Sequence, residues 1–278
     1  MHPALSPDSI AVITGAASGI GLAMARKFRS LGLRVCMLDQ DGERLGAAAS
    51  AMAPDPHAAD QGLLARVADV SNADDLAAAR DAVMDLWDRP PSVLVNNAAT
   101  RTGGGSGAPI EDWRAAFEVN LWGVVNGVRT FAPAMIEAAT PGLIVNLGSK
   151  QGITNPPGNT AYNMTKAALR TYTEALEHEL RGTPGRKVTA HLLVPGWTTT
   201  GGRQHQSGAW MPDQVVEYML AALGRGSFYI VCPDDDVSAA MDRARILWTA
   251  SDITEDRPPL SRWLAEYGPE FERFSRSL

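Results

Sequence analysis

A tyrosine and a lysine stand four residues apart in the stretch AYNMTKAAL, which covers residues 161–169. On a helix, Tyr162 and Lys166 would lie on one face, one turn apart. A free tyrosine, with a pKa of about 10, is a poor base at neutral pH, but a neighbouring cation stabilises the phenolate. The spacing therefore predicts a phenol that gives and takes a proton. The alternative is a chance pair on a helix surface.

A glycine-rich run near the start of the chain has the composition of a phosphate-binding loop. The run TGAASGIG follows a short apolar stretch and precedes a helical pattern, although its glycine spacing is not the standard Gly-x-Gly-x-x-Gly. Glycines let a ligand approach the backbone, and the helix that follows offers unpaired N–H groups. We expect a dinucleotide here, and a turn without a ligand is the alternative. The expected contacts are Gly15, Ser18, Gly19, Ile20 and Gly21.

An acidic residue, Asp39, ends the second strand-like stretch, 18 residues after Gly21. A carboxylate there can accept hydrogen bonds from the adenosine ribose hydroxyls, and it would repel a 2′-phosphate. Gln40 is neutral and Ser18 is not basic, so NAD is favoured over NADP as the cofactor. A helix-capping role for this acid is the alternative, but Asp41 is better placed for it.

These pieces belong to a longer ordered set that resembles the short-chain dehydrogenase/reductase family. The set runs through most of residues 10–200 and comprises TGAASGIG, Asp39, ADVS at 68–71, NNAA at 96–99, the Asn120 of EVNLWG, IVNLGS ending in Ser149, YNMTK, and PGWTTT at 195–200. Ser149 precedes Tyr162 by 13 residues, which is the family's interval. A Tyr-x-x-x-Lys pair alone is a weak signal, and the weight comes from the order of the whole set.

The resemblance implies a role for each matching residue. Tyr162 would exchange the alcohol proton while hydride passes between the carbinol carbon and nicotinamide, and Ser149 would hydrogen-bond the substrate oxygen. Lys166 would also bind the nicotinamide ribose, and Asn120 would hold a water in a proton relay. The further cofactor contacts that it implies are Asp69, Val70, Asn96, Ala98, Pro195, Gly196, Thr198 and Thr200.

The sequence departs from the family pattern in three places. Ala99 replaces the last glycine of the usual NNAG, and Gly148 stands where serine is frequent; both changes are small. The common Val-Asp-Gly-Gly ending is missing, and SFYIVCPDDD with a long tail replaces it. Helices expected at 111–138 and 160–181 would pair in a homodimer, as in the family. A homotetramer is the less favoured assembly because the usual ending is absent.

The family places a substrate lid at residues 197–212, WTTTGGRQHQSGAWMP. Gly201 and Gly202 resemble a hinge, large apolar groups surround them, and Arg203 is the one charge. We therefore expect a hydrophobic secondary alcohol or its ketone as substrate. The candidate substrate contacts are Gln151, Trp197, His205 and Trp210. The alternative for Trp210 is packing against the next helix.

Short apolar stretches alternate with helical patterns along the whole chain. The strand-like stretches are IAVITG, LRVCMLD, LARVADV, SVLVNNAA, GLIVNLGS, KVTAHLLVPG and SFYIVCP. The long helical pattern at 111–137 is expected to break near Pro133. The alternation predicts an α/β, Rossmann-like, doubly wound parallel sheet of about seven strands with helices on both faces. We expect a single domain with a core over 8–232 and a C-terminal helical extension over 233–278.

Composition narrows the class of protein. The formal charge of −6 with no basic run disfavours nucleic acid as a partner. Cys36 and Cys232 lie in apolar stretches, as small core residues do in a reducing compartment. No apolar run approaches the roughly 18 residues that span a membrane, and the first residues lack a secretory pattern, so we expect a cytoplasmic protein without a membrane partner. His178 and His191 have no partners at metal-ligand spacing, so no metal site is expected.

The predicted function is an NAD-dependent oxidoreductase acting on a secondary alcohol or ketone. One alternative is an NADP-linked biosynthetic ketoreductase, which cofactor titration would separate. Another is a non-catalytic dinucleotide-sensing protein on the same fold. Such a protein would need the glycine loop but not the catalytic set, whose members are all present: Asn120, Ser149, Tyr162 and Lys166.

Overall fold

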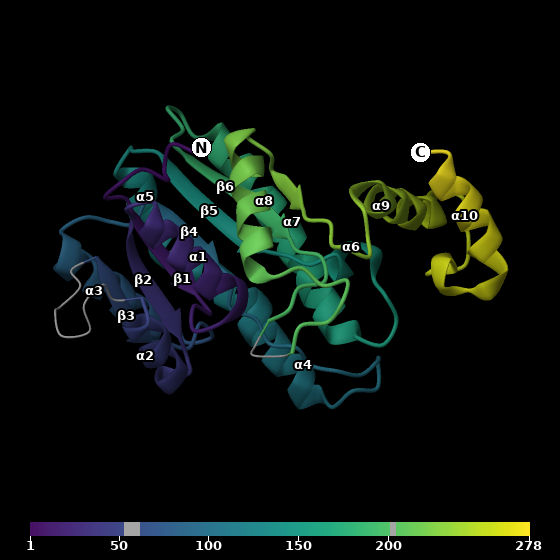
Figure 1. The fold of residues 1–278 in the computed structure, drawn as a ribbon, viewed down its shortest axis with the longest axis horizontal. Helices are drawn as coiled ribbons and strands as arrows, with labels where there is room; N and C mark the ends of the chain where they lie inside the picture. Colours follow the sequence, from purple (N-terminus) through teal and green to yellow (C-terminus); the bar gives the residue numbers. More distant parts are fainter. Residues whose placement is uncertain (53–61, 201–203) are drawn as a thin grey trace.

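The computed structural model describes residues 1–52, 62–200 and 204–278, and a seven-stranded sheet forms its centre (Figure 1). The strands are β1 (Ile10–Thr14), β2 (Arg34–Asp39), β3 (Leu63–Val67), β4 (Val93–Asn96), β5 (Gly142–Leu147), β6 (Val188–Val194) and β7 (Tyr229–Val231). Their order across the sheet is β3-β2-β1-β4-β5-β6-β7, and every neighbouring pair is parallel. The expected doubly wound sheet is therefore confirmed.

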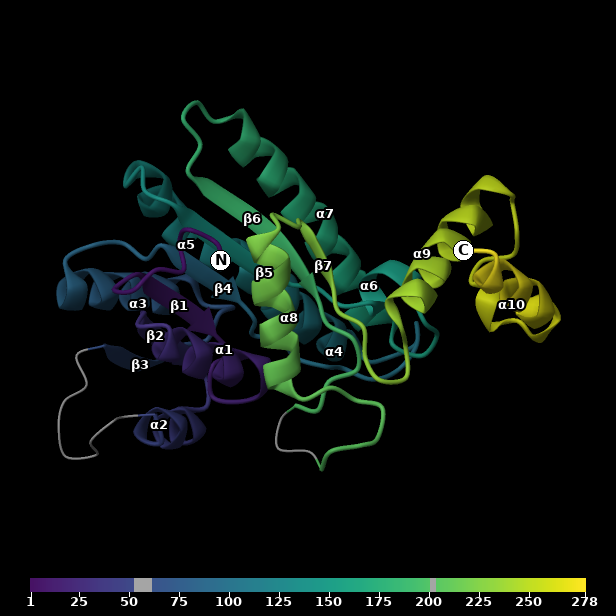
Figure 2. The same ribbon diagram turned by 45° about the horizontal axis from the view of Figure 1, so that its top comes forward.

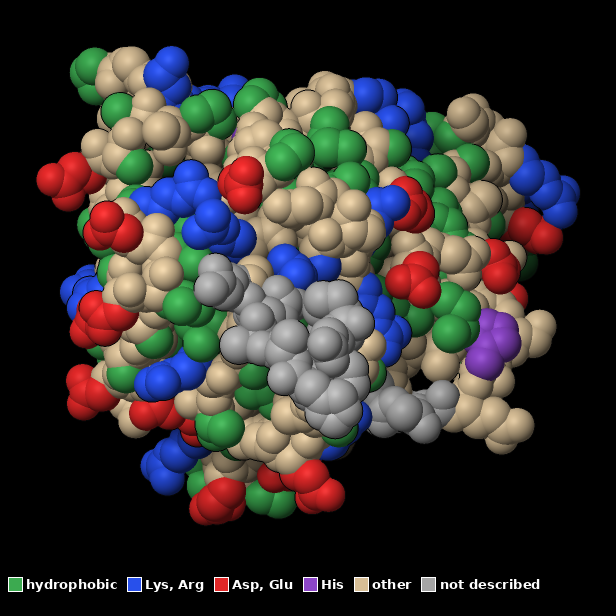
Figure 3. All heavy atoms as spheres, turned by 60° about the vertical axis from the view of Figure 1, so that its left-hand side comes forward, with side chains coloured by type: hydrophobic (Ala, Val, Ile, Leu, Met, Phe, Trp, Pro, Cys, Tyr) green, Lys and Arg blue, Asp and Glu red, His purple; other side chains and the backbone are tan. Residues whose placement is uncertain are grey.

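Helices connect the strands and cover both faces of the sheet. The α-helices are α1 (Gly19–Ser30), α2 (Gly42–Ser50), α3 (Ala73–Trp87), α4 (Ile110–Phe117), α5 (Gly123–Glu137), α6 (Gln151–Thr154), α7 (Thr160–Gly182), α8 (Pro212–Gly224), α9 (Ala239–Thr254) and α10 (Gly268–Arg276). Among the described residues, no helix is of a length and apolarity that would let it cross a bilayer. On the face shown in Figure 3, basic and acidic side chains are interspersed.

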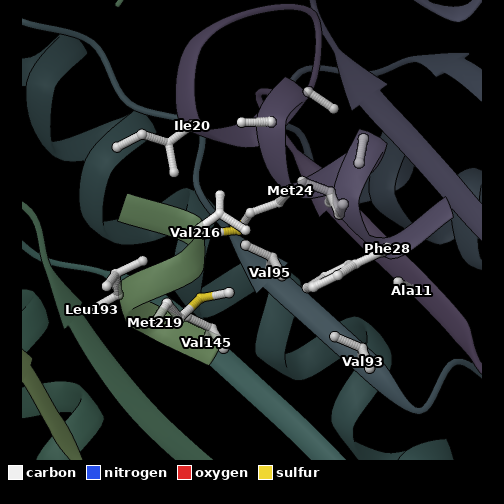
Figure 4. Packing of buried hydrophobic residues seen from close by; sticks show 14 of the residues in the cluster. Ala11, Ile20, Met24, Phe28, Val93, Val95, Val145, Leu193, Val216 and Met219 are labelled. Carbon is white, nitrogen blue, oxygen red and sulfur yellow. The ribbon is translucent and has the colours of Figure 1, made fainter. Parts of the chain in front are cut away.

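Two apolar layers, one on each face, hold the sheet between its helices. Figure 4 shows the first, where Met24 and Phe28 of α1 and Met219 of α8 pack on strand residues such as Val95. The second layer joins α3, α5 and α7 to the alternate strand residues, among them Leu94. Because both faces are covered, each central strand is apolar at nearly every position, which is the pattern that revealed the strands in the sequence.

The long helical pattern at 111–137 is interrupted, but not where proline predicts. Pro133 lies inside α5, and the helix continues through it. The irregular turn is instead a π-helical turn over Glu118–Trp122, between α4 and α5. The side chain of Asn120 in this turn is fully buried and hydrogen-bonded to a neighbouring loop and helix. Single π turns are frequent at functional sites.

The segment after β7 forms a helical extension beside the sheet, away from its centre. Figures 1 and 2 show α9 next to α6, with α10 beyond it at the opposite end of the molecule from α2 and α3. Trp248 of α9 is buried and lies edge-on to Phe271 and Phe274 of α10, with ring centroids 5.4 Å apart in each pair. The guanidinium of Arg257 stacks 3.9 Å above the same indole. The extension thus has a small core of its own.

Candidate active site

A cavity of about 570 Å³ lies at the carboxyl ends of the strands, on both sides of the β1–β4 junction where the chain reverses its direction across the sheet. Open parallel sheets bind ligands at such a switch point. Fifteen residues singled out in the sequence line it: Gly15, Ser18, Gly19, Ile20, Asp39, Asp69, Val70, Ala98, Ser149, Tyr162, Lys166, Pro195, Gly196, Thr198 and Thr200. Seven others do not: Gly21, Asn96, Asn120, Gln151, Trp197, His205 and Trp210.

Helix α7 presents Tyr162 and Lys166 to the cavity from one face. The ammonium nitrogen of Lys166 lies 5.7 Å from the centroid of the Tyr162 ring and donates a 2.7 Å hydrogen bond to the carbonyl of Leu147, at the end of β5. Both side chains are buried. Burial, and then the charge of Arg101, lower the pKa of Lys166 to about 7. The lysine can therefore change its charge close to neutral pH.

Ser149 reaches the same cavity from the turn that follows β5. Its hydroxyl accepts a hydrogen bond of 3.2 Å from the backbone N–H of Gln151, the first residue of α6. Gly148, which stands where the family frequently has serine, packs closely on β6, since a Cβ there would lie 3.1 Å from Leu192 Cδ1. Because the Ser149 hydroxyl accepts this bond, its own proton can be donated to a ligand in the cavity.

Asn120 lies behind the cavity rather than in its wall. Its Oδ1 accepts a hydrogen bond from the N–H of Thr100 at 2.8 Å, and its Nδ2 donates to the Thr100 carbonyl at 3.0 Å and to Thr165 Oγ1 at 3.2 Å. These bonds tie the loop after β4 to α7, one turn from the tyrosine. The structure gives Asn120 a positioning contact, and the water relay that the resemblance implies stays a prediction.

Asn96, an expected cofactor contact, does not line the cavity, whereas its neighbour Asn97 does. Asn96 is buried on the far side of β4, where its Nδ2 donates to Asn146 Oδ1 at 2.8 Å. The close approach of α5 encloses it, because a Cβ on Gly127 would lie 2.3 Å from Asn96 Oδ1. Asn97 lines the cavity and donates from Nδ2 to the carbonyls of Thr14 and Gly15, at 2.8 and 2.9 Å. Side chains alternate along a strand, so adjacent residues face opposite sides.

The glycine loop fits a dinucleotide. Gly15 and Gly19 have φ of 63° and 56°, in the left-handed region that favours glycine. Gly21 does not line the cavity, but it lets the loop fold tightly, since a Cβ there would lie 2.3 Å from the Gly15 carbonyl oxygen. Ser18 stands at the N-cap of α1 without a side-chain capping bond, so its hydroxyl is available to a phosphate at the helix N-terminus.

The loop is braced by side chains that sequence reasoning did not single out. The hydroxyl of Thr14 accepts hydrogen bonds from the N–H groups of Asn97 and Ala98, at 3.0 and 3.1 Å. Asp39 also takes part, because its Oδ2 accepts from Ala17 N at 3.0 Å. The signal available in the sequence was the first letter of TGAASGIG, a threonine at the end of a buried strand.

The candidate substrate contacts lie outside the cavity. Trp210 packs on Tyr218 of α8, with ring centroids 5.8 Å apart, and its indole N–H donates to Asp235 Oδ1 at 3.0 Å. These are packing contacts of the kind that the alternative interpretation of Trp210 expects, and a contact with substrate stays a prediction. His205 hydrogen-bonds Thr199 at 3.1 Å, and the Gln151 side chain accepts from Asn159 Nδ2 at 3.4 Å.

The proposed lid is only partly described. Trp197 is 44% exposed and does not line the cavity, although its backbone pairs with that of Trp210. Gly201, Gly202 and Arg203 lie outside the described residues. The wall near Tyr162 instead contains residues of the loop after β4 and of α4: Ala99, Thr100, Arg101 and Ala115. Sequence periodicity gives no signal for such loop residues.

The part of the chain that the structure describes holds no group of three or more His, Cys, Asp or Glu side chains arranged to bind a metal ion. The titratable groups in the cavity wall are Asp39, Asp69, Arg101, Tyr162 and Lys166. The arrangement supports proton exchange between the Tyr162 phenol and a ligand that Ser149 also contacts.

Comparison with known proteins agrees with this geometry. The family described as short chain dehydrogenase matches residues 9–209. A 1-deoxy-11-beta-hydroxypentalenate dehydrogenase of Streptomyces exfoliatus is 30% identical over 92% of this chain and 94% of its own. A galactitol 2-dehydrogenase (L-tagatose-forming) of Cereibacter sphaeroides is 34% identical over 68% of this chain and 71% of its own. A crystal structure of a short chain dehydrogenase/reductase from Burkholderia phymatum in complex with NAD has a TM-score of 0.81 at 28% identity, covering 93% of this chain and 98% of that one.

Proposed function

Because the chain belongs to the short-chain dehydrogenase family, we propose that it transfers a hydride between NAD and a hydrophobic secondary alcohol or its ketone. It is an oxidoreductase of CH–OH donors, like its named relatives. The observation that carries the finer proposal is the meeting of Ser149, Tyr162 and Lys166 in one cavity that also contains the glycine loop and Asp39.

The residues of the cavity divide the chemistry between them. In the oxidation direction, the Tyr162 phenolate takes the hydroxyl proton of the substrate, and in the reduction direction the phenol returns it. The Ser149 hydroxyl donates a hydrogen bond to the same substrate oxygen and stabilises its developing charge. Lys166, as an ammonium, stabilises the phenolate. The nicotinamide, when bound, supplies the hydride acceptor or donor.

A preference for NAD rests on Asp39. Its carboxylate lines the cavity beside the neutral Gln40, and no basic residue of the described wall accompanies them on the loop after β2. A carboxylate there accepts bonds from ribose hydroxyls and repels a 2′-phosphate. The related structure from Burkholderia phymatum, which was solved with NAD, supports this choice. The NADP-linked ketoreductase remains the second candidate, because a putative ketoacyl reductase is also among the relatives.

The hydrophobic substrate class is supported by the cavity wall. Besides the polar groups already described, the wall contains Ala99, Ala115, Val119 and Leu147. These four side chains offer apolar contacts to a substrate, and the polar groups of the wall would orient it. The Streptomyces relative is named for a hydroxypentalenate, and the Cereibacter relative for galactitol, so relatives of both kinds act on CH–OH groups.

We further propose a homodimer through the two long helical segments at 111–138 and 160–181, with a homotetramer as the alternative. Apolar side chains on these helices are exposed, among them Trp122 at 49% and Met164 at 47%, so a partner face would cover apolar area. Sedimentation at micromolar concentration tests the dimer, and a monomer would refute it.

A cytoplasmic location is proposed from Cys36 and Cys232, which are buried and unpaired. Burial raises the pKa of both thiols to about 12, so they are unreactive core residues.

The experiment that tests the proposed function is a panel of secondary alcohols of increasing size, assayed with NAD and separately with NADP. NADH absorbance should rise with bulky alicyclic or aromatic alcohols, and NAD should give the higher kcat/KM. A Tyr162→Phe variant that binds NAD without turnover is the control for the assay. Absence of turnover across the panel, with NAD bound, would favour the dinucleotide-sensing alternative.

A further inference from the structure

Arg101 carries a positive charge into the catalytic end of the cavity, and no described residue of the chain forms an ion pair with it. It belongs to the loop between β4 and α4, and its guanidinium carbon lies 5.9 Å from the centroid of the Tyr162 ring. The side chain is exposed and lines the cavity. Within residues 1–52, 62–200 and 204–278, it makes no ion pair and no hydrogen bond. The catalytic chemistry described above does not use it.

The described residues around Arg101 do not neutralise its charge. Lys166 is also a cation near the Tyr162 ring, and the charge of Arg101 helps to lower the pKa of Lys166, after burial. The acidic residues of the described wall are Asp39 and Asp69, on the loops after β2 and β3. Those strands lie on the other side of β1 and β4 from β5, which leads to Ser149. The catalytic end of the cavity therefore has a positive charge that no described acid balances.

The backbone that leads to Arg101 is fixed, although its side chain is free. Both the N–H and the carbonyl of the preceding residue, Thr100, are hydrogen-bonded to the buried amide of Asn120, at 2.8 and 3.0 Å. The Asn120 amide is in turn held by Thr165 of α7. This arrangement fixes the backbone position from which the Arg101 side chain extends into the cavity.

We propose that Arg101 binds a carboxylate of the substrate, so that the preferred substrates are hydrophobic hydroxy acids and the corresponding keto acids. The inference rests on the proposed function, because the alcohol must react at Tyr162 while its acid group meets Arg101. A guanidinium matches a carboxylate with two parallel N–H···O bonds, and such charge-assisted bonds are stronger than bonds between neutral groups. The apolar residues of the same wall, Ala99, Ala115, Val119 and Leu147, would contact the rest of the molecule.

A different role for Arg101 makes a different prediction. Its charge could act only on Tyr162 and Lys166, through space, and so tune proton exchange. Removal of the charge would then change the turnover of charged and neutral alcohols by the same factor. A carboxylate-binding role affects the charged substrate alone, and mainly through KM. The ratio of kcat/KM for an acid to that for its amide separates the two roles.

The test compares 4-hydroxycyclohexanecarboxylate with its carboxamide, using NAD and four proteins: wild type, Arg101→Ala, Arg101→Lys and Arg114→Ala. The control Arg114 is also exposed but lies on α4 outside the cavity wall. We expect the wild type to prefer the acid by tenfold or more. Arg101→Ala should lower the acid-to-amide ratio at least tenfold, Arg101→Lys should lower it less, and Arg114→Ala should leave it unchanged. A ratio in Arg101→Ala within twofold of wild type overturns the proposal.

A binding experiment decides the question even if neither alcohol reacts. Cyclohexanecarboxylate and cyclohexanecarboxamide are titrated into the NADH complex of each protein, followed by nicotinamide fluorescence. Tighter binding of the carboxylate that Arg101→Ala weakens tenfold supports the proposal, and equal affinity of wild type for both compounds overturns it. The absence of turnover with any alcohol refutes the proposed function instead, so the two failures are distinguishable.

Discussion

Lys150 forms a largely buried ion pair with Asp242, in which the ammonium nitrogen lies 2.7 Å from Oδ2 of the carboxylate. Lys150 follows Ser149, and Asp242 lies on α9 of the C-terminal extension. A second carboxylate, Asp234, lies 3.2 Å from the same ammonium and also accepts the N–H of Trp197 at 2.9 Å. One cation thus joins the turn after β5 to the extension and, through Asp234, to the loop after β6.

Replacement of Lys150 by Met should destabilise the protein by about 3–5 kcal/mol, because two buried carboxylates lose their cation. Burial raises the pKa of Asp242 despite Lys150, so Asp242→Asn removes a charge that is itself costly and should change stability much less. The double variant Lys150→Met/Asp242→Asn should recover part of the loss. Urea unfolding measures all three, with the exposed Lys187→Met as control. A Lys150→Met variant within about 1 kcal/mol of wild type would contradict this account.

Tyr162→Phe should fold, bind NAD and lose a factor of about 10²–10⁴ in kcat, since the phenol is the proton donor and acceptor. Stopped-flow turnover and NADH titration measure the two properties separately. Tyr172→Phe, on the same helix but outside the cavity wall, is the matched control and should keep its activity. Activity of Tyr162→Phe within about tenfold of wild type would exclude the phenol from the mechanism.

Asp39→Ala should narrow the preference for NAD over NADP in kcat/KM. The substitution removes a hydroxyl acceptor and a charge that repels the 2′-phosphate. It also removes the bond to Ala17 N, so some loss with both cofactors is expected. Asp41→Asn, which changes the N-cap of α2 outside the cavity wall, is the control. If the wild type prefers NADP, Asp39 does not select NAD.

Trp210→Ala should lower kcat/KM for a bulky aromatic alcohol and for 2-propanol by similar factors. Its indole packs on Tyr218 and bonds Asp235 without lining the cavity, so the loss is one of packing. Truncation of a large aromatic residue costs about 3–5 kcal/mol when it is fully buried, and this half-buried indole should cost less. Thermal unfolding checks the stability. Selective loss with the bulky alcohol would restore the lid interpretation.

Lys166→Met should change how stability depends on pH. Burial lowers the pKa of Lys166 to about 7 in the folded protein, from an ordinary value of 10.5. Between these values the unfolded chain binds a proton that the folded protein lacks, so this lysine makes wild-type stability rise with pH. The stability gain of Lys166→Met over wild type should therefore be largest near pH 7 and shrink toward pH 10. Lys27 forms a surface ion pair with Glu217 and serves as the control. The difference in stability between Lys27→Met and wild type should not change with pH over this range. If the difference in stability between Lys166→Met and wild type is also independent of pH, the pKa of Lys166 is not lowered.

The fold was predictable because burial on both faces of the sheet makes the central strands apolar at nearly every position. Six of the seven strands lie within the stretches expected from the sequence, and β3 begins one residue before its stretch, at Leu63. Most of the cofactor and catalytic candidates also line the cavity, since the motifs that contain them lie at strand ends, and parallel strands bring these ends to one edge. Order along the chain was enough to infer proximity in space for these residues.

Other features depend on register and on long-range contacts that no local pattern records. Whether Asn96 or Asn97 faces the cavity depends on the last residue of β4, where one position changes the side of the sheet. Pro133 fits inside α5, whereas the break falls at Asn120, which the loop after β4 and α7 hold. The ion pair of Lys150 with Asp242 joins segments that are far apart in the sequence, and Arg101 lies in a loop without periodicity.

The position of Asp234 and Asp242 late in the chain has a consequence for the order of assembly during synthesis. These two carboxylates follow strands β1 to β6 and helices α6 and α7 in the sequence. As the chain emerges from the ribosome, the sheet can begin to form while Lys150 is still hydrated and without its partners. The turns after β5 and β6 are joined through Lys150, Asp234 and Asp242 only when α9 has been synthesised. The ion pairs that hold the turn containing Ser149 are therefore completed only after most of the core residues have been synthesised.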